Sequence, residues 1–428
     1  MRRRLVVLLA FLFVMMAMVA LVKADAPTVP VKGYLDVISA DWIPTDCYAE
    51  FIQWKQKCGY ETCLTYLKEI RKIYGVKGDI APKIMEYETA RMKELPSGSL
   101  YNVILVSNLF DSDYDRGNFT GGDIPMVKIK RFPNGSLNGP IRSDFCYEFP
   151  NLLSINKGNG EWKDFTLDQL FSAPQVRVGR IRLHMSHAKG LKKTLAMMVE
   201  NEQRLVAQGG VRSAAVAAAL IRRLRDDVTI RSSKKDDYFV LQDTASIAIP
   251  IRDFLAGIVE TTMLTEKDGE QPSVVPCDVP LNGFGTVIAD QDIVVILSSG
   301  RRFIMVQGKI QEENLLSFNA YKRHALVIAD GLVSLRIYEE DLYFEIGSTA
   351  PMLIQNGNAC MAIGTTRWGY FSTSPVLDFL QSDSLPSGRV SYIKSKLRDI
   401  EGWFVFSYVL FGDPTAIDLL GLDVREGK

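Results

Sequence analysis

Three apolar runs decide the fold: Ile293–Leu297 (IVVIL), Ala325–Ala329 (ALVIA) and Ala359–Ile363 (ACMAI). They stop at small or polar residues, which are Ser298-Ser299-Gly300, Asp330-Gly331 and Gly364-Thr365-Thr366. Uniformly apolar runs of about five residues with a polar stop are typical of buried parallel strands. Because ligands of open α/β sheets bind beyond the carboxyl ends of such strands, these three ends are the first place to look for a functional site.

Strands and helices are expected to alternate through the first hundred residues. The expected strands are Tyr34–Ser39, Tyr60–Tyr66 and Tyr101–Ser107, and the expected helices are Asp46–Lys57, Leu67–Tyr74 and Asp79–Leu95, the last with Asp79 as N-cap. This order predicts a doubly wound α/β unit. Two further strands, Ile124–Lys130 and Val176–Leu183, are expected beyond it.

Two long segments, His187–Gln208 and Val211–Asp226, have helical patterns and are joined by the helix-stop signal Gly209-Gly210. We expect this helical pair to connect two halves of the chain. The second half begins at Tyr238–Ile251 and continues through the three apolar runs. Its helices are expected at Ile251–Glu260, Ile304–Phe318, Leu342–Asn356, Ser374–Gln381 and Val390–Ile400.

Composition supports a globular protein without a nucleic-acid partner. The 428 residues are 47% apolar and 23% charged, and the formal net charge is zero. Such a chain has core enough for one large or two medium domains. A nucleic-acid binder needs a basic surface, which neither this balance nor the sequence pI of about 6.8 indicates.

The first 24 residues are predicted to be a targeting segment. Met1–Arg4 is positively charged, and Leu5–Val22 is an unbroken apolar run of 18 residues. Val22-Lys23-Ala24 offers small side chains where a signal peptidase cleaves, so we expect cleavage after Ala24. An uncleaved anchor is the alternative, because such a run at ~1.5 Å per residue reaches ~27 Å, close to bilayer thickness. Either way, we expect an exported protein, secreted or held at the cell surface by this segment alone.

An oxidising compartment permits disulfides among the six cysteines. Cys47, Cys58 and Cys63 lie close together in the sequence, which favours a local bridge. Cys360 lies in an apolar strand and is expected to be a buried thiol. Asn118 and Asn134 begin glycosylation sequons in loop-like sequence.

Short motifs in a fixed order resemble the catalytic region of the gingipain-type cysteine peptidases, relatives of the caspase-like fold. The most telling is Leu410-Phe411-Gly412-Asp413-Pro414-Thr415, similar to the phrase with which that family's catalytic domain commonly ends. The other matching pieces are Tyr34–Ile38, Trp54-Lys55, Gly59-Tyr60, Asp79 with Lys83-Ile84, Tyr101–Val106, Asp123-Ile124-Pro125, Pro174, Val178-Gly179-Arg180-Ile181, Asn356-Gly357 and Ala362–Arg367. The resemblance implies α/β architecture with two adjacent doubly wound subdomains and mostly parallel sheets.

With that resemblance, the chain is expected to divide into four parts. Residues 1–24 are the signal peptide or anchor, 25–186 the first α/β subdomain, 187–236 the helical connection, and 237–428 the second subdomain with the catalytic-position strand ends.

The family's chemistry requires a His base, usually within Gly-His-Gly after one strand, and a Cys nucleophile after the next. In this sequence Gly-His-Gly falls on Ser298-Ser299-Gly300, and the expected Ala-Cys falls on Ala329-Asp330. A Ser hydroxyl is no base near neutral pH, and a lone carboxylate is a poor route to amide cleavage. Ser299 and Asp330 thus indicate a degenerate dyad. Residues expected to line the remaining cleft are Gly300, Arg301, Gly331, Thr365, Thr366 and Trp368.

Two functions from different classes follow. In the first, the chain is a non-catalytic member of the family whose cleft binds peptides or exported proteins. In the second, it is an active cysteine endopeptidase, with His324 or His187 brought to Cys277 or Cys360 by a different topology. His324 opens the strand that ends at Asp330, so we expect it ~18–20 Å from that strand's carboxyl end.

No cofactor is required by either function. Exported peptidases of this type often hold calcium, and Asp111, Asp113 and Asp115 are weak candidates for its oxygen ligands, since a solvated turn has the same pattern. His184 and His187 are spaced to share a helical face, but a solvated helix start explains them better than a metal pair.

Overall fold

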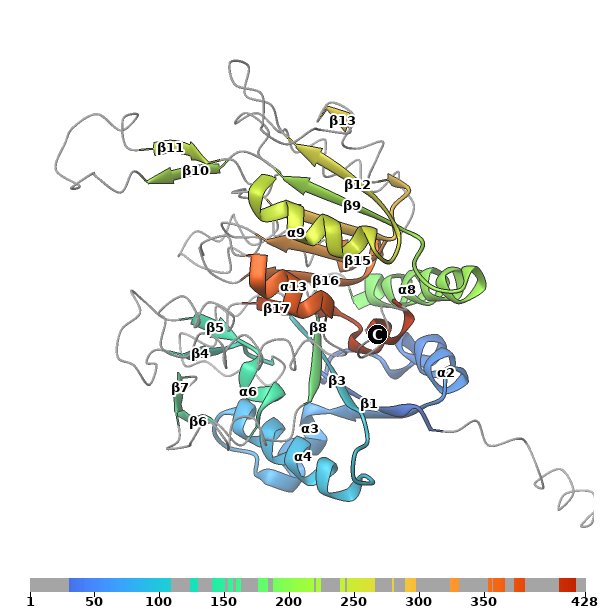
Figure 1. The fold of residues 1–428 in the computed structure, drawn as a ribbon. Helices are drawn as coiled ribbons and strands as arrows, with labels where there is room; N and C mark the ends of the chain where they lie inside the picture. The colour runs from blue at the N-terminus through green and yellow to red at the C-terminus, as the bar shows by residue number, and fades with distance from the viewer. Residues whose placement is uncertain are drawn as a thin grey trace, which may run out of the picture.

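A single large mixed sheet organises the molecule (Figure 1). The computed structural model describes residues 31–108, 124–129, 141–150, 153–156, 159–162, 176–183, 188–218, 221–224, 239–242, 245–265, 279–280, 289–297, 324–330, 353–355, 357–365, 373–381 and 408–420. Its 11-stranded sheet has the order β13-β12-β9-β14-β15-β16-β17-β8-β3-β1-β2. The α/β class predicted from the sequence is therefore confirmed.

The first half of the chain builds one end of the sheet. Its strands are β1 (Gly33–Ser39), β2 (Tyr60–Tyr66), β3 (Tyr101–Asn108) and β8 (Arg177–Leu183), and its helices are η1 (Thr45–Cys47), α2 (Ala49–Lys57), α3 (Leu67–Tyr74), α4 (Ile80–Glu94) and α6 (Phe145–Glu148). All strand pairs here are parallel. The predicted strands and helices of the first hundred residues are confirmed, although Asp79 makes no capping hydrogen bond to α4.

The second half builds the other end. Its sheet strands are β9 (Ser213–Ala218), β12 (Glu260–Thr265), β13 (Val279–Pro280), β14 (Ile293–Leu297), β15 (His324–Asp330) and β16 (Ala359–Thr365), and its helices are α8 (Ala188–Gln208), α9 (Ala245–Ala256) and α13 (Thr373–Gln381). The three strands predicted from the apolar runs are confirmed, and they are parallel neighbours.

The last strand, β17 (Tyr408–Gly412), joins the two ends of the sheet. It runs antiparallel to β16 and parallel to β8. All strands on the β8 side therefore share one direction, and all strands on the β16 side run the opposite way. After β17 the chain turns into η8 (Pro414–Leu419).

Both sides of the sheet use the same strand order. In the first half, the chain passes from β1 to the outer neighbour β2 and then to β3 and β8 on the other side of β1. In the second half it passes in the same way from β9 to the outer neighbour β12, adds the short strand β13 at the outer edge, and continues with β14, β15 and β16 on the other side of β9. No internal repeat is visible in the sequence, but the topology contains one.

The second helix of the expected helical pair is wrong. Val211–Asp226 is not a helix but contains β9 and the hairpin strand β10 (Ile221–Leu224), which pairs with β11 (Phe239–Gln242). Alanine favours helices, but β9 lies between β12 and β14, and its ladders to both strands supply the hydrogen bonds. Within the described residues of the connection expected at 187–236, α8 is helical, whereas β9 and β10 are strands. The next helix, α9, lies earlier in the sequence than expected. It spans Ala245–Ala256, whereas Ile251–Glu260 was expected.

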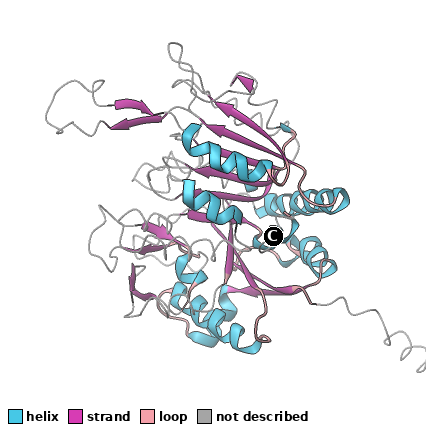
Figure 2. Cartoon of the chain, viewed as in Figure 1, coloured by secondary structure: helices cyan, strands magenta, loops and turns pink. Residues whose placement is uncertain are grey.

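Helices cover the sheet on both faces (Figure 2). Side chains alternate between two apolar cores, since Val103 and Leu105 of β3 belong to one and Ile104 and Val106 to the other. Helices α3, α4, α6, α9 and α13 cover the first face, and α2 and α8 cover the second. A small separate sheet of β4 (Val127–Ile129), β5 (Ile141–Ser143), β6 (Leu153–Asn156) and β7 (Asn159–Trp162) flanks α6.

Several sequence-based expectations lie outside the described residues. These are the targeting segment 1–24, the sequons at Asn118 and Asn134, and the helices 304–318 and 390–400. Within the described part, no helix is long and apolar enough to span a membrane.

Candidate functional site

The carboxyl ends of β14, β15 and β16 meet at one edge of the sheet. Leu297, the last residue of β14, pairs with Asp330, the last residue of β15. Ala329 pairs with Gly364, which precedes the final residue of β16, Thr365. The three strands therefore end side by side at this edge, as the sequence predicted.

Most candidate cleft residues follow these strand ends and lie outside the described residues. These are Ser299, Gly300, Arg301, Gly331, Thr366 and Trp368. The structure places the backbone of Asp330 and Thr365 at adjacent strand ends. Ser299 is two residues beyond the end of β14. The degenerate dyad of Ser299 and Asp330 therefore stays a prediction.

The topology contains a switch point that the sequence did not predict. From β9 the chain goes outward to β12 and returns to β14 on the other side of β9. This is a topological switch point, where ligands of open α/β sheets bind beyond the strand ends. The missed strand β9 creates it, one strand away from the pair formed by β14 and β15. The alanine-rich sequence of β9 did not indicate a strand, so the switch point could not be predicted.

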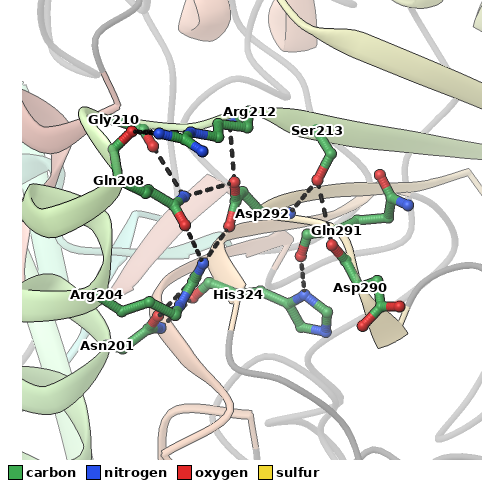
Figure 3. A network of polar contacts seen from close by, with 10 residues as sticks. All are labelled: Asn201, Arg204, Gln208, Gly210, Arg212, Ser213, Asp290, Gln291, Asp292 and His324. Carbon is green, nitrogen blue, oxygen red and sulfur yellow. Dashed lines mark hydrogen bonds and ion pairs between the residues drawn. The ribbon is translucent and has the colours of Figure 1, made fainter.

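A polar network ties the opposite edge of the same strands together (Figure 3). Asp292, immediately before β14, accepts hydrogen bonds from Arg204 Nη1 (2.7 Å) and Gln208 Nε2 (2.9 Å) of α8, and from the backbone N–H of Arg212 (2.8 Å). Each oxygen of the nearly buried carboxylate is thus satisfied. The network fixes the end of α8 to the starts of β9 and β14, and its role is structural.

His324 belongs to this structural edge. Its side chain is fully buried, and its Nδ1 atom contacts the Gln291 carbonyl oxygen (Figure 3). Burial lowers the pKa of the imidazole. Because His324 and Asp330 are the two ends of β15, about 20 Å of strand separates them. His324 therefore cannot serve as a base at the strand ends.

The described cysteines give no sign of an activated thiol. Cys47, Cys58 and Cys63 form no disulfide with one another, so the expected local bridge is wrong. Cys360 is the buried thiol predicted from its apolar strand. Burial raises the pKa of Cys47, Cys58, Cys146 and Cys360, which is the opposite of what a thiolate nucleophile needs.

Metal binding is not supported by the described residues. Among them, no group of three His, Cys, Asp or Glu side chains is arranged to hold an ion. Asp111, Asp113, Asp115, His184 and His187 lie outside the described ranges, so the calcium candidate stays a prediction.

Arg180 is the largest fully buried side chain of the chain's described part. Its Nε and Nη2 atoms donate to the two oxygens of Asp144 at 2.8 and 2.6 Å. Its Nη1 donates to the Ile124 carbonyl oxygen at 2.6 Å. Arg180 thus fixes the segment at 124–125 and the start of α6 to β8, a structural role for a residue that the family resemblance singled out.

Glu88 of α4 is a buried carboxyl with no hydrogen bond to either oxygen within the described structure. Burial raises its pKa well above the ordinary value, and the negative charges of Asp36 and Asp144 add to this. A raised pKa in the folded state means that stability is fully present below the ordinary pKa and is lost as pH rises through the raised one.

Replacing Glu88 by methionine is expected to stabilise the chain by about 1–3 kcal/mol at neutral pH, because the unsatisfied carboxyl is removed while its volume is kept. The gain should grow as pH rises. Urea unfolding at pH 5 and pH 8 measures it, with Glu86→Met on the exposed face of α4 as the matched control. A Glu88→Met variant less stable than the parent at both pH values would contradict this assignment.

Comparison with known proteins supports the fold alone. No family model matches the chain, and no curated protein does so with significance. Among solved structures, 4 chains match. One of them, described as "Structure of Protease", superimposes with a TM-score of 0.54 at 10% sequence identity, over 90% of this chain and 78% of its own. The chain therefore has a protease-like α/β fold.

Proposed function

We propose that the chain is a gingipain-like peptidase homologue that has lost catalysis and binds a peptide or an exported protein at the β14–β16 strand ends. One observation carries this proposal: the last residue of β15, where the family places its nucleophilic Cys, is Asp330. It pairs with the last residue of β14, the strand that the family follows with its His. Ser299 occupies that His position in the sequence.

The proposal includes the finer organisation of the fold. The two ends of the sheet are two caspase-like, doubly wound subdomains, at about 25–186 and 237–428. The repeated strand order and the opposite strand directions of the two ends support this. Because β9 (Ser213–Ala218) pairs with β14 of the second end, we propose that the second subdomain starts at β9 and not at residue 237, the start expected from the sequence.

The chemistry of the cleft suits binding. The carboxylate of Asp330 and the cations Arg301 and Arg302, which follow Ser299-Gly300 in the sequence, provide charges of both signs, and such charges orient a peptide without attacking it. A Ser hydroxyl is no base near neutral pH, and a lone carboxylate is a poor route to amide cleavage. The targeting segment at 1–24 supports export, and hence an exported partner.

An active cysteine peptidase is the alternative outcome. Two of its candidate catalytic residues, His324 and Cys360, are described by the structure. Both are completely buried, so a substrate cannot reach them. The other two candidates, His187 and Cys277, lie outside the described residues. The test must therefore address Cys277.

Alkylation by iodoacetamide at pH 6 separates the two functions. We expect the described thiols with raised pKa values, and Cys277 with them, to react at the slow rate of an ordinary thiol, because only a thiolate attacks the reagent. We also expect no cleavage of denatured casein above the buffer rate. Peptide mapping assigns each label to its cysteine. Fast labelling of one cysteine, together with casein cleavage that the reagent abolishes, would overturn the proposal.

Binding is tested with a random peptide library. Asp330→Arg reverses the charge at the strand end and is expected to weaken capture of the selected peptides at least ~10-fold, the effect of about 1.4 kcal/mol. Glu94→Arg, at the exposed end of α4, makes the same charge change elsewhere and should leave capture unchanged. Equal capture by the two variants would exclude the strand ends as the binding site.

A further inference from the structure

Three charged side chains from distant parts of the chain meet in the interior. Lys55 belongs to α2, Glu202 to α8, and Asp413 to the turn between β17 and η8. Lys55 Nζ lies 2.6 Å from Glu202 Oε2 and also forms an ion pair with Asp413. At most 2% of any of the three side chains is exposed. The cluster therefore links the C-terminal segment to both helices on one face of the sheet.

The charges in this cluster do not balance. One cation faces two carboxylates, which leaves a net charge of −1 when all three groups are ionised. Neutral donors complete the contacts, since Trp54 Nε1 donates to Glu202 Oε2 at 2.7 Å and the Thr415 N–H donates to Asp413 Oδ1 at 2.9 Å. Burying an uncompensated charge is costly.

Among the described residues, the other titratable groups near the cluster do not supply the missing positive charge. Those close enough to act on it electrostatically are Cys58 at the end of α2, Tyr60 of β2 and Cys360 of β16. Burial raises the pKa of each, so all three stay neutral in the physiological range. Two guanidinium groups act on these neighbours, and both have carboxylate partners of their own: Arg204 pairs with Asp292, and Arg177 pairs with Asp418.

A bound proton is then the missing charge. Burial, together with the negative charge of Asp413, raises the pKa of Glu202 to about 7, although Lys55 opposes the shift. Burial disfavours the Lys55 cation, but Asp413 and Glu202 more than compensate, and the pKa of Lys55 rises. The ammonium therefore persists while one proton resides on the carboxyl pair.

We propose that Lys55, Glu202 and Asp413 form a proton-linked latch that holds the β17–η8 segment against α2 and α8. With one proton on the carboxyl pair the cluster is neutral and the latch is closed. When that proton is released to solvent, an uncompensated negative charge remains buried, and the segment opens to hydrate it. The latch is independent of what the strand-end cleft binds.

The direction of the pH effect follows from linkage. A carboxyl whose pKa is higher in the closed state than in the open state favours closure below its ordinary pKa, and this preference is lost as pH rises through the raised value. With an open-state pKa near the ordinary 4.5 and a closed-state value of about 7, the open fraction should increase on the order of 20-fold between pH 5.5 and 7.5.

Hydrogen–deuterium exchange of the full chain tests the latch. Peptides covering residues 408–420 are followed from pH 5.5 to 7.5, with intrinsic exchange rates corrected for pH, and α9 peptides serve as an internal reference. The wild-type segment should open progressively as pH rises, while α9 should not. A wild-type profile without this change would overturn the proposal by itself, whether or not any variant folds.

Matched variants assign the effect to the cluster. Glu202→Gln keeps the shape of the protonated carboxyl at every pH, so its exchange in residues 408–420 should be independent of pH. Glu200→Gln removes the same charge from an exposed position on α8 and should keep the wild-type profile. If Glu202→Gln keeps the wild-type pH dependence, the titrating group lies elsewhere and the latch is wrong.

Discussion

Replacing Arg180 by leucine is expected to lower the free energy of unfolding by about 3–5 kcal/mol. Stability is lost because Asp144 and the Ile124 carbonyl stay buried but no longer receive hydrogen bonds from the Arg180 guanidinium. Lysine does not replace arginine here, since one ammonium cannot reproduce the paired bonds to both Asp144 oxygens. Chemical unfolding monitored by circular dichroism measures the change.

A double-mutant cycle shows how much of this loss comes from leaving the Asp144 carboxylate buried without its partner. Arg180→Leu/Asp144→Leu removes both charges, so it should be more stable than Arg180→Leu alone. Arg252→Leu is the control, because Arg252 pairs with Asp253 at the surface and its loss should cost no more than about 1 kcal/mol. A double variant no more stable than the single one would show that the ion pair is not the source of the loss.

Replacing Gly412 by alanine is the second change with a large expected effect. Gly412 has φ of +97°, and a Cβ atom there would lie 2.2 Å from the Cys360 carbonyl oxygen. The obstacle is backbone of the neighbouring strand, which cannot rotate away. Left-handed strain of about 1–2 kcal/mol and overpacking of about 3 kcal/mol together predict a loss of about 4–5 kcal/mol.

Gly98 provides a matched control for this substitution. Its φ is +81°, but nothing lies within 4 Å of an added Cβ, so Gly98→Ala should show the backbone strain alone. The difference in urea midpoint between the two variants then measures the steric part. Equal losses in both variants would mean that β17 can shift away from β16 without penalty, against the packing described here.

Gly179 explains why two motifs of the sequence occur together. A Cβ at Gly179 would lie 2.3 Å from the Gly412 carbonyl oxygen and 2.6 Å from Pro414 Cδ. The phrase around Gly179-Arg180 and the phrase Gly412-Asp413-Pro414 are thus two sides of one close contact between β8 and the turn after β17. Sequence reasoning found both phrases but could not show that they touch.

The local sequence pattern was sufficient to predict a strand that is buried on both faces. Ile293–Leu297 was predicted as a strand and is one with the same bounds, because five consecutive apolar residues can be buried on both faces only inside a covered sheet. Ser213–Ala218 was mistaken for a helix because its alanines favour one. Its neighbours β12 and β14, which begin 47 and 80 residues later in the sequence, decide that it is a strand.

Buried charges were not predictable in the same way. Lys55 and Glu202 are 147 residues apart, and each resembles an ordinary surface residue of an amphipathic helix. Only the packing of α2 against α8 shows that they are partners. The strand ends at Leu297 and Asp330, by contrast, follow from the rule that parallel strands end at the same edge.

The position of β17 has a consequence for how the protein is made. Its residues, 408–412, lie between β16 and β8 and supply hydrogen bonds to both, yet a ribosome synthesises them long after β8 (Arg177–Leu183). Until they emerge, a nascent chain carries two exposed sheet edges that could pair with other chains. The edge of β8 therefore waits for its partner strand through all of the synthesis that separates β8 from β17.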